Sequence, residues 1–210
     1  MNLADMRTIV RRDLHDEDAA SYRWSDDELD RHIAHAVKEL SQQIRFHFNP
    51  VYQNTADSRE IDISSISDRI KVTTAEYPTA EYPPSYVRFS VWGDTLTMLI
   101  DKAPEASGED VDVRYGKLHT LDAGGSTIPA YLEDVVAIGA EGYAAVEWAS
   151  YATNRVNVGG QGVERDYAIW GGQRLREFKR QLKYHSRRTS IRTQSLQTPQ
   201  DLFSDEYGQG

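Results

Sequence analysis

Cysteine is absent from this chain of 210 residues, which excludes disulfide bridges, cysteine-ligated metals and a thiol nucleophile. Long apolar runs are also missing. The longest unbroken one, Val135–Ala140, is far too short to cross a bilayer, and no apolar leader opens the chain. These absences predict a soluble protein with no membrane partner, and they are compatible with a reducing compartment.

Charge is abundant but unevenly placed. The whole chain has a formal net charge of −9, yet the stretch from Arg174 to Arg192 has a net charge of +7, which leaves −16 for the remainder. An acidic body with a basic arm favours docking onto an acidic partner or onto nucleic acid. A solvated helix face is the simpler interpretation, and the sequence leaves it open.

Four stretches have apolar residues at helical spacing and are predicted to be helices. The second of them opens with Ser25-Asp26-Asp27-Glu28, a capping box, and Trp24 with Leu29 forms a hydrophobic staple across it. Gly171-Gly172 interrupts the last one, which predicts either a kink or a close packing contact. The four stretches are Asn2–Leu14, Trp24–Phe48, the helix that opens Tyr131–Tyr167 before a glycine-rich bend, and Val163–Ser186.

The third helix is rich in small residues. Gly139 and Gly142 leave little side chain on one side of it, so another helix can approach closely, and Tyr143 lies beside them in the sequence. Because its apolar residues cover much of the circumference, we expect this helix to be central in a bundle or to contact another subunit. Gly139, Gly142 and Tyr143 are therefore the predicted subunit-packing residues.

Between the second and third helices the period changes from helical to alternating. Five short apolar segments alternate with polar residues between Arg59 and Leu118, and Gly93-Asp94 joins two of them as a tight hairpin. This pattern predicts a small antiparallel sheet, sandwich or half-barrel. The proline-rich stretch Ala75–Pro84 is predicted to be a surface loop whose tyrosines, Tyr77 and Tyr82, are either partner contacts or part of a plain connector.

The predicted fold is therefore α+β: a four-helix bundle with an inserted antiparallel β module and a C-terminal tail that is disordered until it docks. Its parts are the N-terminal helices of the bundle (1–56), the β module (57–119), the C-terminal helices (120–188) and the flexible tail (189–210). Leu202 and Phe203 are the apolar anchors expected in that tail.

Catalytic and cofactor motifs do not emerge from the sequence. His32, His35 and Glu39 share a helix but lack the spacing of a zinc-protease pair, and Val156–Gly162 fits neither nucleotide-binding glycine fingerprint. Asp16, within an acidic turn, lacks the spacing of a calcium loop. We therefore expect no cofactor, no metal and no enzymatic activity. A cell-wall hydrolase with a Glu/Asp pair is a weaker alternative, because no carboxylate pair stands out.

Three segments together resemble a known family. The opening L-A-D-M-R-T-I-V-R-R-D-L, then W-S-D-D-E-L-D-R-H-I-A-H-A-V-K-E-L, and later T-I-P-A-Y-L-E-D-V-V-A-I-G-A-E-G-Y-A-A, look like the helices of tailed-bacteriophage head–tail adaptor proteins, also called head-completion or connector proteins. The matched segments cover about a third of the chain, and they are more specific as an ordered set than singly.

The resemblance implies a structural virion protein at the head–tail interface that is made in the host cytoplasm. It implies a ring of copies, typically twelve, beneath the portal protein, with DNA passing through the lumen without specific binding. Neck or tail proteins would dock on the ring. By similarity, the basic C-terminal region would reach the portal, so Arg180, Lys183, Arg187, Arg188, Leu202 and Phe203 are the expected docking residues.

A second interpretation is a nucleic-acid-binding module that uses the basic C-terminal helix to follow a phosphate backbone. The acidic charge of the whole chain and the scarcity of aromatic residues in the arm count against it.

Overall fold

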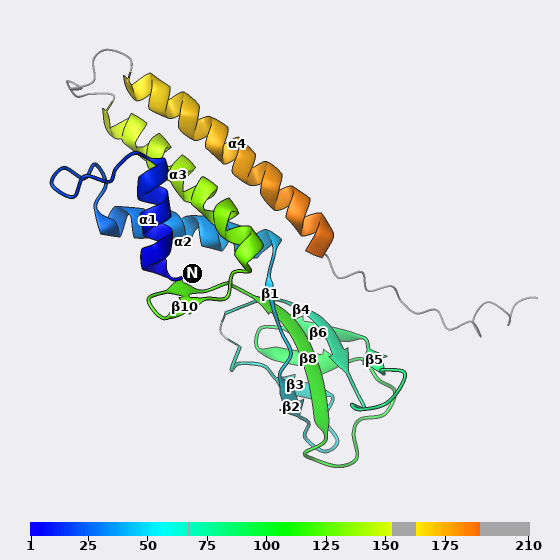
Figure 1. Cartoon of the computed structure of the whole chain (residues 1–210). Coiled ribbons are helices and arrows are strands. Elements are labelled where there is room, and N and C mark those ends of the chain that lie inside the picture. The colour runs from blue at the N-terminus through cyan, green and yellow to red at the C-terminus, as the bar shows by residue number, and fades with distance from the viewer. Residues whose placement is uncertain (67, 153–162, 190–210) are drawn as a thin grey trace, which may run out of the picture.

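The computed structural model describes residues 1–66, 68–152 and 163–189, without the side chains of residues 163, 164, 188 and 189. These residues form a helical part and a β module, each around its own hydrophobic core (Figure 1). The described helices are α1 (Leu3–Asp13), α2 (Asp26–Gln43), α3 (Ala130–Ala152) and α4 (Val163–Thr189). Two helices, a set of strands and two further helices follow one another, in the order that the change of period predicts.

Both N-terminal helices begin where the sequence indicates. Asn2 and Asp5 form a capping box on α1, and Ser25 and Glu28 form the predicted one on α2. However, α2 ends at Gln43, and the prediction that it continues to Phe48 is wrong. Phe46–Phe48 is strand β1, because it pairs with Tyr115–Lys117 on a distant strand that the local pattern does not reveal.

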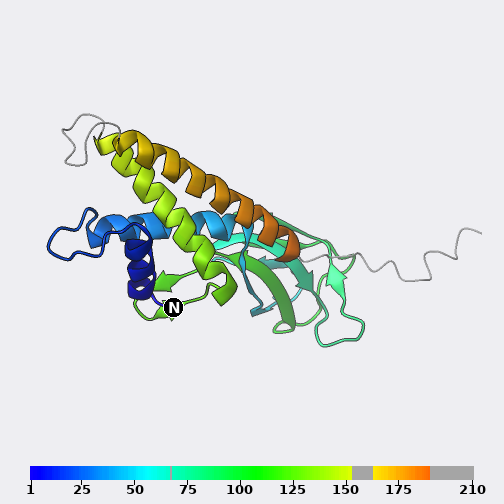
Figure 2. The same cartoon turned by 45° about the horizontal axis from the view of Figure 1, so that its top comes forward.

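Helix α3 is the centre of the helical part. It buries side chains around much of its circumference, and α4 runs antiparallel beside it (Figure 2). Helices α1 and α2 cross this pair rather than running alongside it, so the helical part is not a regular four-helix bundle (Figure 1). An 11-residue α1 is too short to be a full member of such a bundle, and it packs mainly on α2 and α3.

Glycines set the spacing of α3 and α4. A Cβ atom on Gly139 would lie 3.0 Å from the ring of Phe178, and one on Gly142 would lie 2.8 Å from the side chain of Leu175. On the other helix, Gly171 faces Ala145 just as closely. Helix α4 continues through Gly171 and Gly172, and the predicted close packing contact is made by Gly171.

The β module consists of two antiparallel sheets. The larger joins β1, β8, β4 and β5 in that order, with β2 also paired to β8, and the smaller is ordered β3-β7-β6. Their apolar faces share one core, and the predicted alternating residues, such as Leu96, Val111 and Val113, are wholly buried in it. The strands are β1, β2 (Val51–Gln53), β3 (Glu60–Asp62), β4 (Arg69–Glu76), β5 (Tyr86–Val87), β6 (Phe89–Trp92), β7 (Thr95–Met98) and β8 (Asp110–Lys117).

The hairpin between β6 and β7 turns at Gly93-Asp94 as predicted, with Gly93 at a φ of 56°. The sequence predicts that the β module begins at residue 57, whereas its first strand begins earlier, at Phe46. In the proline-rich loop, the hydroxyl of Tyr77 donates to Glu109 within the module, whereas Tyr82 is almost fully exposed.

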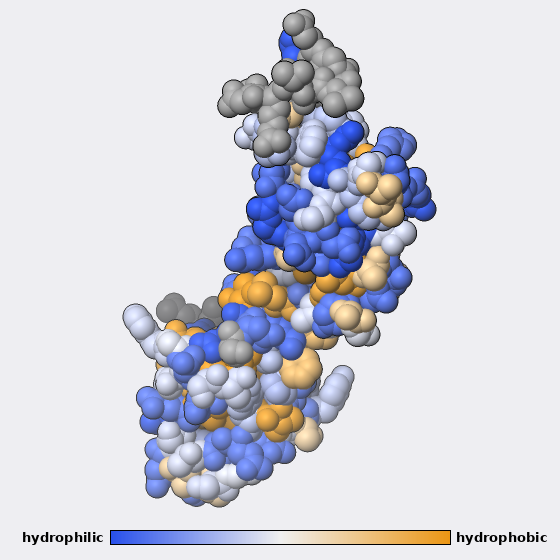
Figure 3. Space-filling view, turned by 90° about the vertical axis from the view of Figure 1, so that its left-hand side faces the viewer, coloured by the Kyte–Doolittle hydropathy of each residue, from blue (hydrophilic) through white to orange (hydrophobic). Residues whose placement is uncertain are grey.

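A short hairpin joins the module back to the helices. Residues 120–128 contain β9 (Leu121–Asp122) and β10 (Gly125–Ser126). Beside it the buried Ser41 Oγ accepts a hydrogen bond of 2.9 Å from the backbone N–H of His119. The molecule is elongated, and Figure 3 shows hydrophobic residues gathered where the helical part meets the β module.

Candidate functional site

The outward face of α4 carries a row of cations. Arg176, Arg180, Lys183 and Arg187 follow one another at intervals of four, three and four residues, which places them on one side of a helix. All four are exposed, whereas Phe178 on the opposite side of α4 is wholly buried against α3. We call these four residues the basic stripe.

One acid lies next to the basic stripe. Glu177 accepts hydrogen bonds of 2.6 and 2.7 Å from Arg180, and these, with one from Gln181, lower the pKa of Glu177 to about 2. Arg180 is therefore partly neutralised. Lys183 makes no ion pair with any described residue, which leaves it as a strongly hydrated cation facing solvent.

All four stripe residues lie in the basic arm, and Arg180, Lys183 and Arg187 are among the expected docking residues, whereas Arg176 is not. Its spacing from Arg180 is the signal that identifies it. Arg174 also counts toward the basic arm in sequence, but its side chain points inward and its Nε donates to the buried Glu141 at 2.6 Å. The side chain of Arg188 and the whole of Leu202 and Phe203 lie outside the described residues.

The three predicted subunit-packing residues have different surroundings. Gly139 and Gly142 are covered by α4 of the same chain, so the close helix approach that they permit is made within the subunit. Tyr143, about one turn after Gly139, is partly buried, with its ring edge-on to Phe178 of α4 and its hydroxyl donating to Glu39 of α2. Burial, together with this hydrogen bond, raises the pKa of Tyr143.

Tyr143 lines an open groove on one flank of the helical part. The ring of His35 stacks on that of Tyr143 with centroids 4.1 Å apart, and Lys38 and Gln42 extend the groove along α2. Arg31 lies at its edge and is paired with Glu147 of α3. The groove is thus polar, with an excess of cationic and aromatic groups.

The sequence offers three residues as possible metal ligands, and in the structure each of them contacts a protein group. The Nε2 atom of His32 lies 2.6 Å from the Glu147 carboxylate, His35 stacks on Tyr143, and Glu39 accepts from the hydroxyl of Tyr143. Within residues 1–66, 68–152 and 163–189, no cluster of three acidic or histidine side chains could hold a metal ion. Among the helices described, none is long and apolar enough to span a membrane.

Comparison with known proteins adds little. No family model matches the chain, and no curated protein matches it. Among solved structures, the chain is similar to one in the neck of an empty GTA particle, computed with C6 symmetry: 14% of residues are identical, 80% of this chain and 88% of that one are covered, and the TM-score is 0.30. A likeness this slight carries no argument about fold or function.

Proposed function

We propose that this chain is a structural virion protein, a head–tail adaptor that forms a ring beneath the portal protein. The observation that carries the proposal is the basic stripe on α4. It is an exposed row of cations on a chain whose remaining residues have a net negative charge. The sequence resemblance to head–tail adaptors supports it independently. In this role the ring extends the DNA channel and gives neck or tail proteins a surface on which to dock.

The stripe favours a partner with an acidic surface. Opposite charges accelerate the encounter of two proteins and set their relative orientation more than they add affinity. A rigid helix presents Arg180, Lys183 and Arg187 in fixed register, which suits a contact that is repeated around a ring. Leu202 and Phe203, farther along the chain, would add apolar anchors once the helix has docked.

An acidic body also suits a DNA channel. Phosphate binding requires clustered cations, so an acidic lumen would let DNA pass without being retained. The alternative in which the stripe itself binds nucleic acid makes the opposite prediction, namely tight DNA binding by the isolated chain that weakens steeply with salt.

The test is co-assembly with the portal protein from the same genome, imaged by electron microscopy. The full chain should add a ring to the portal, and the charge-reversed variant Lys183→Glu/Arg187→Glu should lose it. The matched control, Lys71→Glu/Lys102→Glu, changes the net charge equally at two exposed lysines of the β module and should still bind.

A variant that ends before Thr189 separates the stripe from the tail. A ring that survives this truncation would assign docking to α4 alone and remove Leu202 and Phe203 from it. Absence of a ring with the full chain, or its persistence after charge reversal, would contradict the proposal. DNA binding that weakens with salt and is lost in the charge-reversed variant would support the alternative, a nucleic-acid-binding module.

A further inference from the structure

A small cavity lies on one flank of the helical part, where the end of α1 meets the start of α4. Its volume is about 240 Å³, and it is lined by Asp13, Leu14, His15, Asp166, Tyr167 and Trp170. Sites for small-molecule ligands usually measure roughly 300–1,000 Å³, so this cavity suits a single side chain better than a metabolite.

The charges around the cavity favour a cation. Asp13 and Asp166 contribute two carboxylates, and the only ion pair of Asp13 among the described residues is a long one of 3.6 Å to Arg12. Next to Asp13 lies Glu141, which is wholly buried. Its Oε1 atom meets no hydrogen-bond donor in the described chain. Arg174 is paired with Glu141, and Asp166 makes no ion pair with any described residue.

Aromatic rings complete this site. Tyr167 and Trp170 form part of the cavity wall, and the guanidinium of Arg174 already lies 5.6 Å from the ring centre of Trp170. Carboxylates together with aromatic faces are the groups that recognise lysine and arginine side chains. A cavity with these groups favours a cationic side chain as its occupant.

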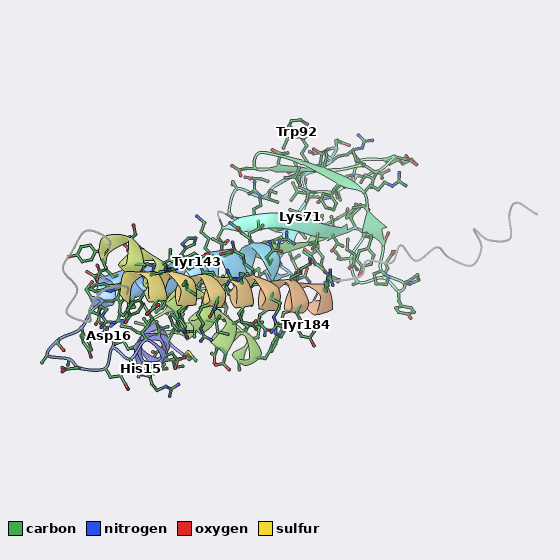
Figure 4. The ribbon with its side chains drawn as sticks, turned by 90° about the horizontal axis from the view of Figure 1, so that it is seen from above. His15, Asp16, Lys71, Trp92, Tyr143 and Tyr184 are labelled. Atoms are coloured by element: carbon green, nitrogen blue, oxygen red, sulfur yellow. The ribbon has the colours of Figure 1, made fainter. Side chains whose placement is uncertain are left out.

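A matching donor lies on the opposite flank. Glu141 and Tyr143 are two residues apart on α3, and thus about 200° apart around the helix. Figure 4 shows Tyr143 on one side of α4 and His15, which lines the cavity, on the other. In the groove beside Tyr143, Lys38 is exposed and makes no ion pair with any described residue.

We infer that the Lys38 side chain of one copy enters the Asp13/Asp166 cavity of the next copy. Because donor and acceptor occupy opposite flanks, this contact is head-to-tail, and repeating it closes a ring or extends a filament. The inference rests on the proposed ring and identifies its lateral contact. It leaves the basic stripe on α4 available for another partner.

The absence of cysteine makes a clean cross-linking test possible. The double variant Gln42→Cys/Ile169→Cys keeps Lys38, Asp13 and Asp166 and places one thiol in the groove and the other one helical turn from Asp166. Treated with a short bis-maleimide at high protein concentration and low salt, it should give a ladder of covalent oligomers on a denaturing gel. The matched control, Lys71→Cys/Ile169→Cys, moves the first thiol to the β module and should give no ladder. Intermolecular linkage is confirmed if dilution weakens the ladder.

Two results would overturn this contact. One is a double variant with no more oligomer than the control. The other is efficient dimer formation by Gln42→Cys alone, since that would place two copies of the same flank face to face. Neither result depends on the portal protein, so failure here leaves the docking role of α4 standing, and loss of portal docking leaves this contact untouched.

Charge exchange gives a second measurement that needs no cross-linker. Lys38→Glu and Asp166→Lys should each weaken self-association about tenfold, measured by sedimentation, because each puts like charges together. Combining both changes in one chain should restore association. Failure of the combined variant to recover would count against the pairing.

Discussion

At the scale of single residues, Glu141 is the most unusual group in the helical core. Its side chain is wholly buried between α1, α3 and α4, where it meets Asp13 and Arg174. Burial raises the pKa of Glu141 to about 7, Arg174 opposes that shift, and Asp13 adds to it. A proton shared between the two carboxyl groups would satisfy the Oε1 atom that meets no donor among the described residues.

This raised pKa predicts how stability depends on pH. In the unfolded chain Glu141 titrates near 4.5, so between that pH and about 7 the folded protein holds the extra proton. The stabilisation is complete below pH 4.5 and is lost as the pH rises through 7, at a cost of up to about 3 kcal/mol. Urea unfolding across this range should show the decline.

The matched variant is Glu141→Gln, which cannot titrate. Its free energy of unfolding should vary less with pH over the same interval than that of the wild type. Parallel pH profiles for the two proteins would show that Glu141 does not hold the proton. Lys183→Gln, at an exposed position on α4, controls for a general effect of charge removal.

At the scale of elements, the packing of α3 against α4 depends on glycine. A Cβ atom on Gly142 would lie 2.8 Å from the Leu175 side chain and 3.1 Å from its backbone nitrogen, so the two helices would have to separate. Gly172, on the next helix, has no such restriction, since its nearest neighbour would be the flexible Arg176 side chain at 3.8 Å.

We therefore expect substitution by alanine to change the free energy of unfolding in opposite directions at these two glycines. Gly142→Ala should lower the free energy of unfolding by about 1–3 kcal/mol, because overpacking outweighs the better helix propensity of alanine. Gly172→Ala should raise it by up to about 1 kcal/mol, because only the propensity changes. Thermal or denaturant unfolding measures both, and equal effects would show that the α3–α4 contact is less tight than described.

At the scale of the whole molecule, two separate cores suggest two folding units. One core is formed by the helices, and the other lies between the two sheets of the β module. The Ser41–His119 hydrogen bond and the short hairpin β9–β10 lie where the two parts join. Damage to one core should therefore remain largely local.

Substitution of one buried leucine tests this separation. Leu96→Ala removes a wholly buried side chain from the β module and should cost about 2–5 kcal/mol there. Amide hydrogen exchange should accelerate in β4 and β8 but not in α3. The reciprocal variant, Val136→Ala in the helical core, should accelerate α3 and spare the module; equal acceleration of both parts by either variant would indicate one cooperative unit.

The type and order of most elements could be predicted from local signals in the sequence. Capping residues such as Ser25 and Glu28, the change from helical to alternating period, and the Gly93-Asp94 turn are local signals, because each acts between residues a few positions apart. The net charges of the acidic body and the basic arm could also be predicted, because they depend only on composition.

Contacts between groups far apart in the sequence could not be predicted and are seen in the folded chain. Phe46–Phe48 is a strand because of its pairing with β8, Arg174 turns inward because Glu141 lies across from it on α3, and Gly139 is covered by Phe178 of the same chain. The acceptor cavity likewise joins Asp13 to Asp166, which are far apart in the sequence. Such contacts depend on the relative placement of whole elements, and the spacing of residues within one element does not specify it.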